Sequence, residues 1–150
     1  MTQTIRVAER LVNLGNIFGI NVEKLGQRLE AENAFKQGMI FQFSWERGED
    51  AIAAYNEAIK YNKIFWQAWL LRGIVLCQLE QFEEAVTSFT EVIKIQPNDT
   101  ATLTACNGKG FALSQLGKIQ QAIAAYEQAL KINPNDRAAL TNKNRLLEKK

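Results

Sequence analysis

The chain has 150 residues, of which 47% are hydrophobic and 23% are charged, and its net charge is +2. This composition excludes a disordered chain, because the sequence contains enough apolar side chains to form a core. A charge so close to balance argues against nucleic acid or an acidic membrane surface as the partner. No run approaches the roughly eighteen consecutive apolar residues that a membrane span requires.

The N-terminal residues and the two cysteines indicate the cellular compartment in which the protein is expected to lie. The first ten residues lack the charged-then-apolar layout of a secretory signal, because Glu9 and Arg10 fall where the apolar core should be. Cys77 and Cys106 have neither the number nor the spacing of a disulfide framework or a metal site. We therefore expect a cytoplasmic protein with reduced thiols.

The strongest signal in the sequence is an internal repeat. Residues 51–60, 85–94 and 122–131 carry nearly the same run, with alanine first and an aromatic residue four positions later. Within each run the apolar residues recur at helical spacing, which predicts an amphipathic helix and not a strand. The small alanine one turn from a large aromatic ring suits close packing between helices.

A further helix is predicted before each of the last two runs, over residues 69–76 and 106–113. Gly73 and Gly110 stand 12 positions before the alanine that opens the following run. A glycine inside a helix costs about 1 kcal/mol relative to alanine. Its recurrence therefore indicates close approach of the two helices of a hairpin, and we expect the glycine to face the alanine.

Turn residues separate these helices. Leu116-Gly117-Lys118 predicts the end of a helix followed by a turn. Pro97-Asn98-Asp99 and Pro134-Asn135-Asp136 each predict the end of one helix and the cap of the next.

The pattern resembles the tetratricopeptide repeat family, whose repeats are about 34 residues long. The residues that carry the resemblance are Trp69, Gly73, Phe82, Ala85, Phe89 and Pro97 in one repeat, and Gly110, Leu116, Gly117, Ala122, Tyr126, Ala129 and Pro134 in the next. The resemblance covers about residues 66–136 and extends less closely to 31–63, where Gly38 lies 13 positions before Ala51. It implies an all-α fold, a right-handed superhelix of helix-turn-helix hairpins known as an α-solenoid.

The resemblance also divides the chain. We expect three repeats within residues 31–136, at about 31–63, 66–99 and 100–136, followed by a C-terminal capping helix over 137–150. Three extra residues, Thr100-Ala101-Thr102, lengthen the first helix of the last repeat by almost a turn.

Residues 1–30 are interpreted as an N-terminal helical cap. An apolar-rich helix is predicted to end near Gly19, and Asn21 is predicted to cap a second helix. One long helix from Val22 to Trp45 is an alternative. Dimerisation through residues 1–30, or filling of a groove by these residues, is another.

The sequence contains no recognisable catalytic motif. The chain has no histidine, the commonest general base and metal ligand. Gly108-Lys109-Gly110 lacks the preceding strand and the spaced first glycine of a phosphate loop. The two cysteines suit apolar packing inside helices. We expect no enzymatic activity, no cofactor and no metal ion.

The resemblance instead implies a binding surface, because in tetratricopeptide arrays the first helices of successive repeats line a concave groove. Transferred position by position, the predicted groove residues are Phe35, Lys36, Met39, Phe43, Gln67, Leu70, Leu71, Ile74, Gln78, Asn107, Phe111, Gln115, Asn142 and Arg145. Neighbouring groove positions carry Glu32, Gln42, Cys77, Thr104, Gly108 and Ser114. Relatives that hold the C-terminal carboxylate of heat-shock chaperones use a lysine and asparagines, whereas Leu70 and Ile74 occupy equivalent places here, which disfavours that activity.

We therefore predict a protein-protein interaction module that binds an apolar or amphipathic segment of a partner protein in the groove. One alternative is a structural, self-associating scaffold whose groove is covered by its own N-terminal helices, with a homodimer formed through residues 1–30. Another is a small secretion-type or assembly chaperone. RNA binding is disfavoured by the near-balanced charge.

Overall fold

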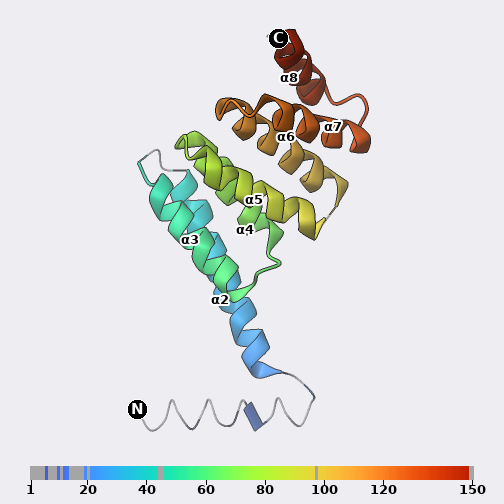
Figure 1. Ribbon diagram of the computed structural model, residues 1–150. Helices are drawn as coiled ribbons and strands as arrows, with labels where there is room; N and C mark the ends of the chain where they lie inside the picture. Colours follow the sequence, from blue (N-terminus) through green and yellow to red (C-terminus); the bar gives the residue numbers. More distant parts are fainter. Residues whose placement is uncertain are drawn as a thin grey trace.

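The computed structural model describes residues 6, 10, 12–13, 19, 21–43, 46–96 and 98–148. This part of the chain contains seven helices and no strand. The helices are α2 (Val22–Gln42), α3 (Gly48–Tyr61), α4 (Trp66–Gln78), α5 (Phe82–Ile95), α6 (Asp99–Gln115), α7 (Ile119–Ile132) and α8 (Arg137–Glu148). They follow one another as stacked antiparallel hairpins (Figure 1). The predicted all-α solenoid is confirmed.

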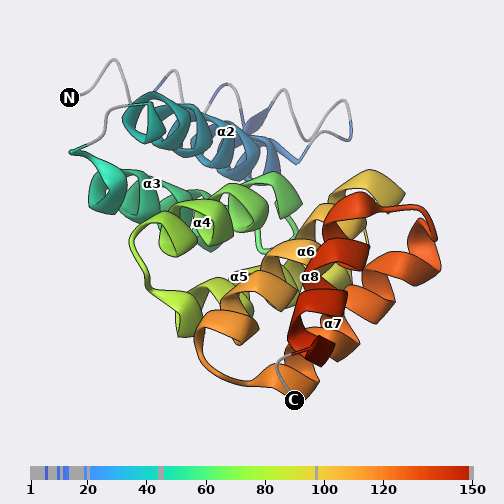
Figure 2. The same cartoon turned by 90° about the horizontal axis from the view of Figure 1, so that it is seen from above.

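The hairpins pair α2 with α3, α4 with α5 and α6 with α7, and α8 packs on α7. Each hairpin contacts the next through α3 and α4 or through α5 and α6. The first helices also approach one another, since α4 contacts α6 and α6 contacts α8. The first helices therefore lie on the inner side of the stack, which Figure 2 shows from above. None of the described helices is long and apolar enough to cross a membrane.

α2 is one continuous helix of 21 residues, so a boundary at residue 30 falls inside it. The alternative of a single helix from Val22 is nearer to the structure, although the helix ends at Gln42. Asn21 caps it as predicted, because its side chain accepts a 2.9 Å hydrogen bond from the Lys24 backbone N–H. The helix expected to end near Gly19 lies largely outside the described residues.

The turn predictions hold for the described residues. Asn98 caps α6 by accepting a 2.8 Å hydrogen bond from the Ala101 N–H, and α6 has 17 residues against 13 in α4, the extra turn that was predicted. Gly117 has a φ of +71°, the left-handed conformation that ends a helix. Asp136 accepts a 2.9 Å hydrogen bond from the Ala139 N–H and so caps α8. Pro97 lies outside the described residues.

The repeated glycines face aromatic rings, and the expectation that they face the alanines is wrong. A Cβ added at each glycine would lie far inside van der Waals distance of a ring on the second helix of the same hairpin. The nearest distances are 2.5 Å for Gly38 and Tyr55, 2.8 Å for Gly73 and Phe89, and 2.7 Å for Gly110 and Tyr126. Each ring therefore needs the space of the absent side chain, and all three rings are buried, at 0%, 2% and 1% exposure.

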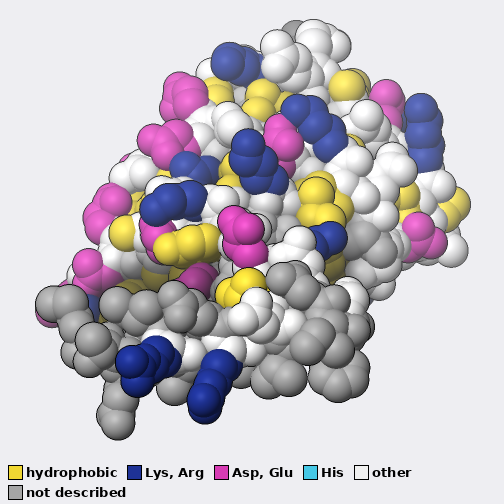
Figure 3. Space-filling view, turned by 90° about the horizontal axis from the view of Figure 1, so that it is seen from below, with side chains coloured by type: hydrophobic (Ala, Val, Ile, Leu, Met, Phe, Trp, Pro, Cys, Tyr) yellow, Lys and Arg dark blue, Asp and Glu magenta, His cyan; other side chains and the backbone are white. Residues whose placement is uncertain are grey.

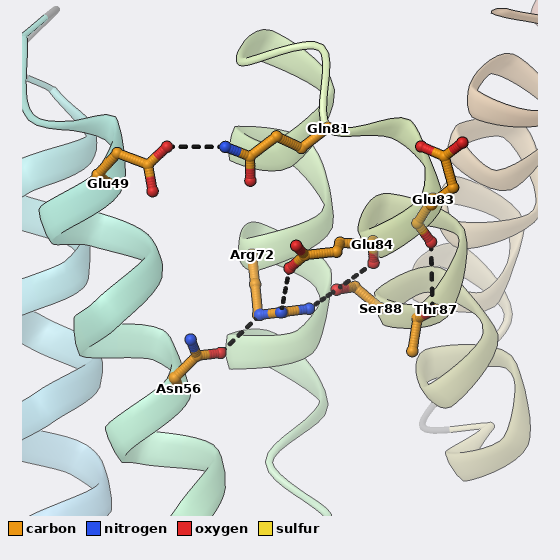
Figure 4. Close-up of polar contacts among 8 residues, drawn as sticks. All are labelled: Glu49, Asn56, Arg72, Gln81, Glu83, Glu84, Thr87 and Ser88. Atoms are coloured by element: carbon orange, nitrogen blue, oxygen red, sulfur yellow. Dashed lines mark hydrogen bonds and ion pairs between the residues drawn. The ribbon is translucent and has the colours of Figure 1, made fainter. Parts of the chain in front are cut away.

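A polar network joins the first two hairpins (Figure 4). Arg72 of α4 donates from Nε to Asn56 Oδ1 of α3 at 2.6 Å and from Nη1 to Ser88 Oγ of α5. Its Nη2 pairs with Glu84 Oε2 at 3.0 Å. The Arg72 side chain is only 12% exposed, and burial lowers its pKa against the opposing effect of Glu84. One guanidinium thus fixes the position of α4 against both α3 and α5.

Candidate functional site

A hollow of about 560 Å³ opens between α4 and α6 on the inner side of the stack. We call it the central hollow, and its lining residues are Ile74, Cys77, Gln78, Phe89, Thr104, Asn107, Gly108 and Phe111. All of these described residues are uncharged, and most of the exposed lining is apolar. A hollow of this size and character suits an apolar side chain or a short stretch of peptide.

Phe89 of α5 forms the bottom of the central hollow because the two first helices leave room for its ring. A Cβ at Gly73 of α4 would lie 2.8 Å from the ring, and a Cβ at Gly108 of α6 would lie 2.5 Å from it. The ring therefore passes between two helices at points where both lack a side chain. This arrangement presents an aromatic surface to the hollow from the outer layer of helices.

The other two repeats place tyrosine where the middle repeat has Phe89. The Tyr55 hydroxyl donates to Gln42 Oε1 at 2.6 Å, and burial raises the Tyr55 pKa to about 12. Burial also raises the pKa of Tyr126, against the opposing effect of hydrogen bonding to Ser114 and Asn142. Phe89, the equivalent residue of the middle repeat, has no hydroxyl. The bottom of the central hollow is apolar for this reason.

Cys77 stands four positions after the repeat glycine, where the other repeats have Gln42 and Ser114. It is half-buried and free, and burial raises its pKa to about 11. The thiol is therefore protonated at neutral pH and contributes apolar surface to the hollow. Cys106 is buried in the core, and burial raises its pKa as well.

Asn107 and Phe111 form the α6 side of the hollow. The Phe111 side chain is 42% exposed and meets Phe82 edge-on, with ring centroids 6.1 Å apart. Asn107 Nδ2 donates to Asp136 Oδ2 at 2.9 Å, the same carboxylate that caps α8. Asn107 Oδ1 is buried and has no hydrogen-bond partner among the described residues. The amide is thus held in one orientation beside an apolar hollow.

Four of the predicted groove residues come together at the central hollow, namely Ile74, Gln78, Asn107 and Phe111. Three others are half-buried against the core, as Ile74 also is, but they do not line this hollow. The Phe35 ring lies 4.8 Å from that of Phe65, centroid to centroid, and Leu70 and Leu71 are partly buried against the core. Gln67 lines a separate, smaller hollow of about 250 Å³ beside the connection between α3 and α4.

The remaining predicted groove residues lie away from the hollow. Lys36 and Met39 are exposed on α2, and Phe43, the residue that follows α2, is 85% exposed. Gln115 is exposed at the end of α6, and Asn142 and Arg145 lie on α8, where both act on the Tyr126 hydroxyl. Phe89 was not among the predicted groove residues. Its one sequence signal is that phenylalanine replaces the tyrosine of the other two repeats.

The charges on the surface are mixed. On the face shown in Figure 3, basic and acidic side chains alternate, with small groups of hydrophobic side chains between them. The ion pairs agree with this mixture, since Lys60 pairs with Glu57 at 3.0 Å and Lys143 with Glu127 at 2.8 Å. Such an arrangement gives no extended field of one sign.

Comparisons with known proteins agree with the geometry. Residues 66–135 match the family model described as tetratricopeptide repeat, whereas no curated protein matches the sequence. The Arabidopsis OM64 TPR domain is similar in structure, with a TM-score of 0.72 and 22% identity over 83% of this chain and 99% of that domain.

Two further solved structures are similar. The second TPR domain of human RPAP3, in complex with the HSP70 peptide SGPTIEEVD, has a TM-score of 0.68 and 23% identity, covering 82% of this chain and 97% of that one. The TPR2B domain of yeast Sti1 in its pHsp70 complex has a TM-score of 0.69 and 21% identity, covering 81% and 99%. At these identities the likeness establishes the fold.

The matched residues span the hairpins α4–α5 and α6–α7, which share the contact between a first-helix glycine and a second-helix ring. The hairpin α2–α3 makes the same contact through Gly38 and Tyr55. Sequence pattern, family model and structure therefore agree: residues 66–135 of the chain belong to the tetratricopeptide repeat family, and the hairpin α2–α3 shares their fold.

Proposed function

We propose that the chain is a non-enzymatic interaction module that binds an apolar or amphipathic segment of a partner protein in the groove of its first helices. The observation that carries this proposal is the central hollow, which is open, apolar and uncharged and has the Phe89 ring at its bottom. Burying one large apolar side chain there is worth about 1.5–3 kcal/mol. Such an anchor side chain is typical of the residues that dominate binding energy at interfaces.

The chemistry of the hollow favours a ligand different from those in the similar structures. The HSP70 peptide bound by human RPAP3 ends in Glu-Glu-Val-Asp. A carboxylate is stabilised by nearby cations and loses its hydration on an apolar surface. The residues that line the central hollow supply no cation. We infer that an apolar side chain, and not a terminal carboxylate, occupies this hollow.

Other groove positions extend the proposed contact surface on either side of the hollow. Met39 and Phe43 present apolar side chains at the α2 end, while Asn142 and Arg145 provide polar groups at the α8 end. A partner segment with an apolar centre and polar flanks fits this order. A reducing, cytoplasmic setting is part of the proposal, because both cysteines are free thiols.

Peptide display tests the proposal, with the HSP70 peptide SGPTIEEVD as the acidic comparison. Peptides selected on the full chain are expected to share a large apolar residue and to lose binding to the Ile74→Glu variant. The matched control is Ile40→Glu, because Ile40 is 60% exposed and lines neither the central hollow nor the smaller one. Loss of binding in both variants, or in neither, would contradict the central hollow as the anchor site. Preferential binding of SGPTIEEVD would contradict the ligand class.

A further inference from the structure

One side of α2 is exposed and combines apolar with charged side chains. Its residues recur at intervals of four, three, four, four and three, which place them on one side of a helix. We call this side the α2 face, and its residues are Leu25, Leu29, Glu32, Lys36, Ile40 and Phe43. The four apolar side chains are between 46% and 85% exposed. Phe43 follows the helix but keeps helical backbone angles, with φ −77° and ψ −6°, so it continues the same side.

The α2 face lies at one end of the array. α2 and α3 form the hairpin at this end, and α8 lies at the other end (Figure 1). The buried Gly38 of α2 is on the opposite side of the helix, against the Tyr55 ring of α3. By contrast, the interior first helix α6 is packed between α5 and α7. An exposed apolar patch at the end of a stack of hairpins marks a contact site.

The α2 face is nearly symmetric about Ala34. Each of its residues before Ala34 has a counterpart at a similar separation after it, namely nine and nine, five and six, and two and two positions away. The counterparts are Leu25 and Phe43, Leu29 and Ile40, and Glu32 and Lys36. When two copies of α2 lie antiparallel about a two-fold axis at Ala34, each side chain meets its counterpart on the other copy. Apolar residues then meet apolar residues, and carboxylates meet ammonium groups.

The two charged residues select both the partner and its direction. The antiparallel arrangement forms two ion pairs, each between Glu32 of one copy and Lys36 of the other. A parallel arrangement would instead place Glu32 beside Glu32 and Lys36 beside Lys36, which is repulsive. Within one chain, Glu32 Oε1 lies 3.8 Å from Arg28 Nη2, and the two side chains are 47% and 70% exposed. Such a long surface pair contributes little, so it does not compete strongly with Lys36 of a second copy.

We propose that two copies of this chain dimerise through the α2 face, with their α2 helices antiparallel. The four apolar residues form the dry part of the contact, and the two Glu32–Lys36 pairs fix its register. The dimer joins two arrays at the ends that carry α2. It buries Phe43 but leaves Met39 and the central hollow, which lies between α4 and α6, open to a partner segment. This interface goes beyond the proposed function and does not depend on it.

Sedimentation equilibrium of the full chain over a concentration series tests the interface. The wild-type mass is expected to rise with concentration from 17.0 kDa towards twice that value. Glu32→Lys and Lys36→Glu are each expected to raise the dissociation constant about tenfold or more, because the dimer then holds two like-charge contacts. The matched control is Glu30→Lys, which makes the same charge change at an exposed residue on another side of α2 and is expected to leave the dimer unchanged.

An equal mixture of the two single variants gives the sharpest test. The Glu32→Lys chain carries two cations on its α2 face, and the Lys36→Glu chain carries two anions. A heterodimer of the two therefore regains both ion pairs. The mixture is expected to dimerise with a dissociation constant near the wild-type value, although each variant alone dimerises more weakly. Circular dichroism of every variant verifies that the helices are retained.

The apolar part of the interface has its own test. Leu29→Gln is expected to weaken the dimer, whereas Leu147→Gln, at a 44% exposed residue of α8, is expected to leave it unchanged. A wild-type mass of 17.0 kDa at every concentration would overturn the proposal. So would a dimer that Glu32→Lys and Lys36→Glu leave unchanged, or one that Glu30→Lys weakens equally. A mixture of the two charge variants that dimerises no better than either alone would also overturn it, because the antiparallel register requires the exchange.

Discussion

The ring of Phe89 fills the space that a side chain at Gly108 would need, because a Cβ there would lie 2.5 Å from Phe89 Cζ. The ring is 2% exposed and touches α4 on its other side, where a Cβ at Gly73 would lie 2.8 Å away. It therefore cannot move aside without disturbing a second helix. This contact sets the distance between α4 and α6 and with it the width of the central hollow.

Gly108→Ala is expected to destabilise the protein by about 1–3 kcal/mol, because the added methyl group overpacks the contact with Phe89. The effect opposes helix propensity, which favours alanine over glycine by about 1 kcal/mol. Urea unfolding followed by circular dichroism measures the difference.

Gly26→Ala is the matched control, because Gly26 also lies inside a helix but a Cβ there meets no atom within 4 Å. This change is expected to stabilise the chain by up to about 1 kcal/mol. Equal stabilisation by the two substitutions would show that the Phe89 ring yields easily, contrary to the packing described above.

Arg72→Met is expected to lower the free energy of unfolding by about 1–3 kcal/mol. The substitution keeps much of the side-chain volume but removes the hydrogen bonds to Asn56, Ser88 and Glu84. Arg72→Lys is expected to recover only part of the loss, because an ammonium cannot reproduce the planar fork that reaches α3 and α5 together. Thermal unfolding of both variants measures this order.

The control for Arg72 is Lys60→Met, which breaks the exposed pair with Glu57. Both of its side chains are more than 40% exposed, and surface pairs of this kind contribute little. The unfolding midpoint is expected to stay at the wild-type value. A midpoint as low as that of Arg72→Met would mean that the Arg72 hydrogen bonds stabilise the fold no more than an exposed ion pair does.

The repeat could be predicted from the sequence because glycine, alanine and aromatic residues recur at fixed separations. The network around Arg72 could not, because Arg72 and its partners Asn56 and Ser88 are each 16 positions apart and belong to three helices. The Asn21 cap predicted the start of α2 at Val22, whereas the continuity of α2 through residue 30 was harder to predict. Apolar residues such as Leu25 and Leu29 continue the helical pattern up to residue 30, so the sequence gives no break there that would indicate the first residue of a repeat.

Part of the candidate site could be predicted from the repeat positions. Repeat positions placed Ile74 and Phe111 on the inner side, and both line the central hollow. Leu70 and Leu71 were assigned to the groove in the same way, and like Ile74 they are half-buried against the core, but they do not line the central hollow. Phe89 was not predicted as a groove residue because it belongs to a second helix. Its ring reaches the hollow only because Gly73 and Gly108 have no side chains.

Alkylation of Cys77 is expected to be slow at pH 8 and to rise with pH beyond the range of an ordinary thiol. Burial raises the Cys77 pKa from 9.0 to about 11, and only the thiolate reacts. At pH 8 the thiolate fraction is therefore about a hundredfold below that of an unperturbed cysteine, since each pKa unit is a factor of ten. Iodoacetamide labelling of Cys106→Ala, with the chain unfolded in urea as the reference, measures the ratio.

A peptide that occupies the central hollow should protect Cys77 further, since the thiol lines that hollow. Labelling at the full rate in the presence of saturating peptide would place the peptide elsewhere. Labelling of the free chain as fast as the unfolded reference would contradict the burial of Cys77.

Phe89→Tyr is expected to destabilise the chain by about 1–3 kcal/mol and to weaken binding of apolar peptides. In the first repeat the equivalent hydroxyl of Tyr55 donates to Gln42. At the position of Gln42 the middle repeat has Cys77, a weak acceptor, so the new hydroxyl would lie beside the hollow without a good partner. Urea unfolding and peptide titration of the single variant measure the two effects.

The double variant Phe89→Tyr, Cys77→Gln tests whether this partnership is the cause. It recreates the pair that Tyr55 and Gln42 form at 2.6 Å, so stability should recover by about 1 kcal/mol relative to the sum of the single changes. Peptide affinity should not recover, because the hydroxyl and the amide would make the bottom of the hollow polar. Additive effects on stability would mean that the side chain at 77 does not reach the ring at 89. Recovered peptide affinity would mean that the apolar bottom of the hollow is not what binds the peptide.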